Sequence, residues 1–137
     1  AVVFARAVTV NGAQLRDPEQ EALPTEADDP RLFDQDQDGQ PGVTVQIGGL
    51  LEGEVQLVQR TITRLSGTRD DDEMSGLLDW SAEESVLQAS NELLATPIPV
   101  ERHRDPELSF FKARRIEPGT SCADIMANAE AWFEPAN

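Results

Sequence analysis

The sequence predicts one mainly β domain over residues 1–137, an antiparallel barrel or sandwich with one C-terminal α-helix. Three observations predict this class. Short segments are rich in β-branched residues or alternate between apolar and polar residues, turn signals such as Asn11-Gly12 separate them, and one amphipathic helical pattern stands near the end. A length of 137 residues suits one compact domain.

Three strands are predicted in the first half of the chain. Residues 2–10 are rich in β-branched side chains and end at the Asn-Gly turn. Residues 43–47 alternate as a half-buried strand does, and residues 13–30 before them form a polar loop with prolines. Residues 54–66 form the longest strand. Its alternation is impure, which indicates a β-bulge or a twisted strand, and Gly67 is expected to end it.

The second half contains further strands and one ambiguous segment. Residues 70–73 are four consecutive acids, which need water and therefore predict a hairpin tip or a solvated loop. Residues 74–80 and 108–116 are predicted strands. In residues 81–94, Ser81 and Glu84 fit a helical capping box. The alternative is a hairpin turn at Glu83-Glu84 with residues 85–90 as the returning strand, which the surrounding hairpins favour. Between these two alternatives we favour the strand.

The C-terminal helix is predicted over residues 121–133. Its apolar side chains recur at helical spacing and form one stripe: Cys122, Ile125, Met126, Ala129, Trp132 and Phe133. Thr120 or Ser121 can cap the first turn, Asp124 suits the positive end of the helix dipole, and Pro135 stops the helix. We expect the stripe to pack into the core.

The charge balance disfavours several kinds of partner. Twenty-six acidic residues against 11 basic ones give a net charge of −15, so the surface repels nucleic acid and anionic membranes. No apolar run approaches the roughly 20 residues of a transmembrane helix. Lys112 is the only lysine, a composition typical of bacteria that are salt-adapted or rich in GC. Cationic partners, cations or simple solubility account for the charge.

The chain has one cysteine, Cys122, and one histidine, His103. Neither stands in a catalytic motif, so we expect no enzymatic activity and assign no catalytic or cofactor-binding residues. A lone cysteine is most often a small buried apolar residue. The alternative is a disulfide whose partner lies outside this numbering.

One motif carries chemistry, the D-x-D-x-D-G run of residues 34–39. This spacing aims the carboxylates of Asp34, Asp36 and Asp38 at one point, while the glycine permits a sharp turn. Hard oxygen donors of this kind suit calcium. The sequence therefore predicts a calcium site, and an acidic turn without a metal is the alternative.

The rest of the coordination shell is less regular. The backbone carbonyl of Gln40 is predicted as a further ligand, and Glu52 is the nearest acid that can complete the shell. An EF-hand is excluded, because the bidentate glutamate of its twelfth position is replaced by Val45. An incomplete shell of this kind predicts weak affinity.

The phrase DQDQDGQPGVTV (34–45), with Val58-Gln59-Arg60 and the late Cys122, resembles uncharacterised exported proteins of myxobacterial type. The resemblance covers residues 30–125. It implies an exported protein, secreted or in the cell envelope, without a known activity. Residues 1–10 lack the features of a signal peptide and the chain starts without Met, so we expect any targeting segment to precede this numbering.

Two functions compete. The first is a binding module for a small apolar or cationic ligand, which needs an apolar cavity. The alternative is a calcium-stabilised structural or cell-surface interaction domain, which predicts a packed interior and a metal at the three aspartates.

Overall fold

The computed structural model describes residues 2–4, 6–49, 52–97 and 99–132. Within these ranges, six strands form one sheet. They are β1 (Val2–Val3), β2 (Ala7–Asn11), β3 (Val43–Ile47), β4 (Gly53–Asp70), β5 (Glu73–Ala89) and β6 (Phe110–Arg114). Four short helical segments are η1 (Glu92–Leu94), η2 (Pro106–Leu108), α1 (Cys122–Ala127) and α2 (Ala129–Trp132).

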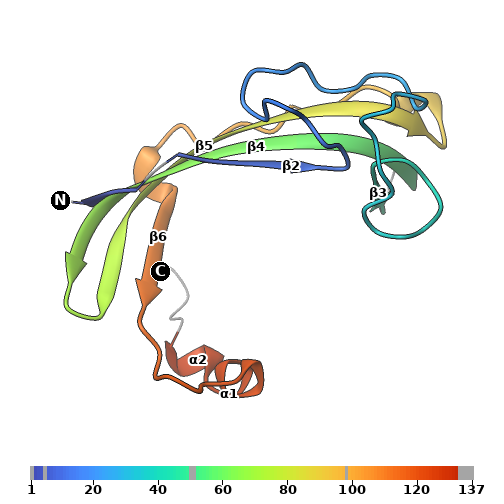
Figure 1. Cartoon of the computed structure of the whole chain (residues 1–137). Helices are drawn as coiled ribbons and strands as arrows, with labels where there is room; N and C mark the ends of the chain where they lie inside the picture. The colour runs from blue at the N-terminus through green and yellow to red at the C-terminus, as the bar shows by residue number, and fades with distance from the viewer. Residues whose placement is uncertain (1, 5, 50–51, 98, 133–137) are drawn as a thin grey trace.

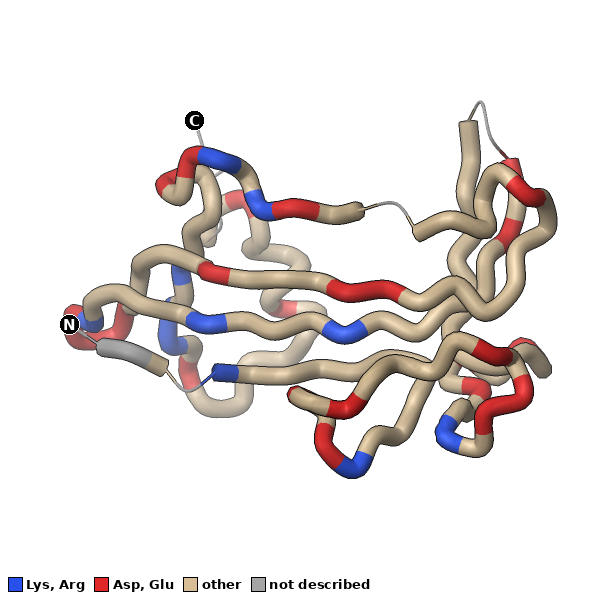
Figure 2. The backbone as a smooth tube through the Cα atoms, turned by 90° about the horizontal axis from the view of Figure 1, so that it is seen from above, with Lys and Arg blue, Asp and Glu red and all other residues tan. Residues whose placement is uncertain are grey.

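The sheet is built on the long antiparallel hairpin of β4 and β5. The strands β1, β2 and β3 follow one another along the other edge of β4, and β6 pairs with the first part of β5. Seen from above, the strands lie side by side as one layer (Figure 2). The prediction of a mainly β, antiparallel fold is confirmed. Among the described residues the sheet is open, so it does not take the barrel form (Figure 1).

The structure assigns residues 81–89 of the ambiguous segment 81–94 to strand β5 and residues 92–94 to η1. The predicted hairpin turn at Glu83-Glu84 is wrong, because β5 runs without a break through both residues. Glu83 lies opposite Arg60 and Glu84 lies opposite Gln59, so both glutamates have cross-strand partners. The predicted bulge is also present, as a register shift between Gln56 and Leu57. The hairpin tip falls at residues 71–72, as the acidic run predicted.

The prediction that Gly67 ends a strand is wrong, because β4 continues to Asp70. Gly67 lies directly opposite Gly76 of β5. A Cβ atom on Gly67 would stand only 2.0 Å from the carbonyl oxygen of Ser75. The glycine therefore permits a close approach of two strands instead of breaking one.

The core lies between the sheet and a loop layer formed by residues 12–42, which runs above the sheet in Figure 1. Val58 of β4 is fully buried against Ala13, Leu15 and Leu23 of this layer. The loop lacks regular structure, so its polar groups need local partners. Arg60 supplies one such link, since its guanidinium donates to the carbonyl oxygens of Pro18 and Glu21.

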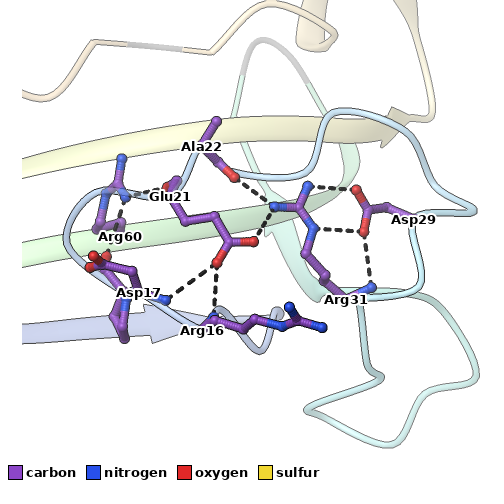
Figure 3. Close-up of polar contacts among 8 residues, drawn as sticks. Arg16, Asp17, Glu21, Ala22, Asp29, Arg31 and Arg60 are labelled. Carbon is purple, nitrogen blue, oxygen red and sulfur yellow. Dashed lines mark hydrogen bonds and ion pairs between the residues drawn. The ribbon is translucent and has the colours of Figure 1, made fainter.

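Ion pairs hold the loop layer in shape (Figure 3). Arg31 pairs with Asp29 at 2.6 Å and with Glu21 at 2.9 Å, and Glu21 also accepts the backbone N–H of Arg16 at 2.8 Å. Hydrogen bonding from Arg31 is the main cause that lowers the pKa of Asp29 to about 2. A carboxylate with a depressed pKa stabilises the fold above its ordinary pKa, so this contribution is lost as the pH falls toward 2.

The C-terminal helix is present but broken into α1 and α2 at Asn128, and both hang below the sheet beyond β6 (Figure 1). Ser121, one of the two predicted caps, caps α1, and it also forms a capping box with Asp124 that was not predicted from the sequence. The expectation that the apolar stripe packs into the core is wrong for its described members. None of them is buried, and Met126 is 76% exposed. Phe133 and Pro135 lie outside the described residues.

Because Trp132 is only half-buried, Trp132→Ala is expected to lower the free energy of unfolding by about 1 kcal/mol or less. A buried tryptophan in a core helix would cost roughly 3–5 kcal/mol. Urea denaturation of both proteins measures the difference. A loss in the range of a buried tryptophan, roughly 3–5 kcal/mol, would contradict the peripheral position of α2.

No helix in the described ranges has the length and apolarity that crossing a membrane requires.

Candidate metal centre

The predicted metal motif forms a closed loop, residues 34–42, at the end of the loop layer and directly before β3. Its base is fixed by two backbone hydrogen bonds, from Gln35 N–H to Gly42 O at 3.2 Å and from Gly42 N–H to Phe33 O at 3.0 Å. Gly42 has a φ of 90°, and a Cβ atom there would stand 2.6 Å from the carbonyl oxygen of Leu57. The end of the loop therefore packs directly on the backbone of β4.

The loop brings the three predicted aspartates together. Carboxylate oxygens of Asp34, Asp36 and Asp38 lie within 4.8 Å of one another, and all three side chains are exposed. Two residues have left-handed backbone and curl the chain: Gln37, between Asp36 and Asp38, at φ 62°, and Gly39, directly after Asp38, at φ 86°. The D-x-D-x-D-G spacing thus converges as predicted, and this exposed group can hold a metal ion.

Backbone amides orient the carboxylates before any metal binds. Asp34 accepts the N–H groups of Asp38 at 3.2 Å and Gly39 at 2.9 Å. Asp36 accepts the N–H of Thr44 at 2.8 Å and so caps the first part of β3. A carboxylate oxygen that accepts one N–H keeps a further lone pair for a cation.

Asp38 has a lowered pKa. The Thr44 hydroxyl and, second, the Gln40 N–H at 2.8 Å lower the pKa of Asp38. The Thr44 hydroxyl oxygen is buried and makes no hydrogen bond of good geometry among the described residues, so the Gln40 N–H is the donor that holds the Asp38 carboxylate. Asp38 is therefore ionised at neutral pH, as a cation ligand must be.

The other predicted ligands are placed less closely. Gln40 borders the cluster through its N–H, and the role of its carbonyl stays a prediction. Glu52 is not part of the acidic group, and its carbonyl oxygen instead faces Asn91 at the start of η1. The three aspartates are thus the only predicted ligands whose side chains the described fold brings together.

Gln35 was missed by sequence reasoning. Its side-chain oxygen accepts the N–H of Gly12 at 2.7 Å, and its side-chain nitrogen donates to Asn11 at 3.3 Å. This side chain ties the metal loop to the end of β2. No local pattern marks it, because the contact spans more than twenty residues of sequence.

The two candidate nucleophile or base residues lie elsewhere. His103 is exposed in a loop and accepts the N–H of Asp105 at 3.1 Å through Nδ1. Cys122 is exposed at the start of α1, so the prediction of a buried thiol is wrong. Because α1 lies apart from the sheet, the Cys122 side chain has no core to pack into.

The chain was compared with protein-family models, with curated proteins and with solved structures, and none of them matched it.

Proposed function

We propose that this chain is a calcium-stabilised structural or interaction domain of an exported, non-catalytic protein. The observation that carries the proposal is the convergence of Asp34, Asp36 and Asp38 within 4.8 Å on a loop that leads into β3. Three carboxylates so close together repel one another, and a divalent cation removes that repulsion. Calcium is favoured because it accepts flexible shells of carboxylate, carbonyl and water oxygens.

Calcium would fasten an edge of the sheet. β3 pairs only with β4 among the described strands, and its first residues are held by the Asp36 contact to Thr44. A cation that orders the aspartates would order that contact as well. The exposed setting and the few protein ligands agree with the weak affinities, about 0.1–1 mM, of extracellular calcium modules.

Thermal unfolding tests the proposal. The protein is expected to melt at a higher temperature in calcium than in chelator, with a gain of about 2.7 kcal/mol at a hundredfold excess over Kd. Ionic strength must be equal in both samples, because screening alone stabilises so acidic a chain.

Two matched double variants distinguish the effect of calcium binding on stability from the effect of removing negative charge. Asp36→Asn with Asp38→Asn should abolish the calcium-specific shift. Asp70→Asn with Asp71→Asn removes the same charge at the hairpin tip and should keep it. A wild-type protein that gains nothing beyond a monovalent-salt control would show that the run is only an acidic turn.

A further inference from the structure

The open face of the sheet carries an apolar groove at the β3 end. Aliphatic side chains of three adjacent strands line it: Val43, Val45, Ile47, Val55, Leu57 and Val86. Val55 and Leu57 are buried and form its floor, whereas Val45 is 38% exposed at its edge. The groove has a volume of about 280 Å³.

One charged side chain lines this groove, Glu84 of β5. Its carboxylate accepts the side-chain amide of Gln59 at 2.7 Å, and Glu84 is half-buried. Among the described residues no Arg, Lys or His pairs with Glu84. Its neighbour Glu83 points to the other face and is paired with Arg60. In the part of the chain that the structure describes, the Glu84 carboxylate in the groove thus has no cationic partner, whereas Glu83 has Arg60.

The chain segments that line the groove carry acids and no bases. The sequence has no Lys, Arg or His between residues 32 and 59 or between residues 70 and 101, and these segments supply all the lining residues except Asn11. They do carry Glu54, next to β3, and Glu92, in η1. Acidic segments predominate at this end of the molecule, on the right in Figure 2. The lining of the groove therefore offers an anion no basic side chain.

We propose that the groove binds a small organic ammonium ion, with its aliphatic body on Val55 and Leu57 and its N–H groups on Glu84. A volume of about 280 Å³ lies just below the roughly 300–1,000 Å³ of drug-sized ligand sites, so the ligand must be small. A stable protein interface needs roughly 20–30 residues a side, more than this groove offers. A small ligand therefore fits the groove better than a second protein does.

The aliphatic chain of such a ligand would contact the apolar floor, and its ammonium group would contact the Glu84 carboxylate. Transfer of the aliphatic chain from water onto the floor supplies the driving force. The ammonium gives Glu84 a charge-assisted hydrogen bond, which is stronger than a neutral one and stronger still beside an apolar surface. The neutral Gln59 amide fixes the position of the carboxylate without neutralising its charge.

Titration by NMR with three probes of one size tests the proposal: hexylammonium, hexanol and hexanoate. The titrations are done at constant ionic strength and with chelator, so that they do not depend on calcium. Hexylammonium should shift the amide signals of β3 and of Val55 saturably, with about tenfold tighter binding than hexanol. Hexanoate should bind most weakly.

The variants Glu84→Gln and Glu83→Gln remove one charge each from adjacent residues on opposite faces. Glu84→Gln should reduce the preference for hexylammonium over hexanol to about one, while Glu83→Gln should keep it. The proposal is overturned by the absence of saturable shifts, by equal binding of hexylammonium and hexanol to the wild type, or by shifts that spread equally to residues 70–73. The comparison of probes on the wild type decides the matter even where a variant folds poorly.

Discussion

Arg60→Ala is expected to lower the free energy of unfolding by about 3 kcal/mol, the largest loss we predict for one side chain. Arg60 is 8% exposed, and its guanidinium joins β4 to the loop layer and to β5. Without it, the carbonyl oxygens of Pro18 and Glu21 lose their donor under the loop layer. The aliphatic stem of the arginine also leaves a gap beside Val58. Because Glu83 is more than half exposed, its lost ion pair adds little.

Arg64→Ala is the matched control, since Arg64 lies four residues further along β4 and is exposed. Its free energy of unfolding should change by less than about 0.5 kcal/mol. Arg60→Lys should give an intermediate loss, because an ammonium lacks the planar fork that reaches several acceptors at once. Urea denaturation measures all three variants. Equal losses for Arg60→Ala and Arg64→Ala would mean that the loop layer does not depend on this link.

Gly67→Ala is expected to cost about 3 kcal/mol, at the upper end of ordinary overpacking. The added methyl would stand 2.0 Å from Ser75 O and 2.8 Å from the Cα of Gly76. These are backbone atoms, so no side-chain rotation removes the clash, and the two strands must separate. Gly76→Ala should behave in the same way, since its methyl would stand 2.1 Å from Ser66 O.

Gly48→Ala is the control for glycine replacement, because no heavy atom of the described residues beyond its two chain neighbours lies within 4 Å of the added methyl. It should leave the melting temperature nearly unchanged. Hydrogen exchange should locate the damage of Gly67→Ala at the hairpin tip and at β6, which pairs with β5 at Gly76. Normal protection of β6 in this variant would count against the close approach of the two strands.

The sequence predicted best where a pattern is local. Residues 43–47 form a strand with the predicted ends, the acidic run forms a hairpin tip, and the three aspartates converge, since turn geometry and alternation act over a few residues. Ser121, one of the two predicted caps, likewise caps α1.

Prediction was weakest where distant partners decide the structure. Glu83 and Glu84 look like the first turn of a helix, but Arg60 and Gln59 across the hairpin hold them in a strand. Gly67 looks like a strand terminator until Gly76 is placed opposite it. The apolar stripe of residues 122–132 predicts a core helix, yet periodicity cannot tell whether a surface lies opposite to receive it.

The short strand β3 contacts both the metal loop and the apolar groove. Its Thr44 N–H is held by Asp36 of the metal loop, while Val43 and Val45 on either side line the apolar groove. A ligand that orders β3 from one side reduces the conformational entropy that is lost when a second ligand binds on the other side. Calcium and an ammonium ligand would therefore assist each other. Such coupling is reciprocal, so the factor by which calcium tightens amine binding must equal the factor by which the amine tightens calcium binding.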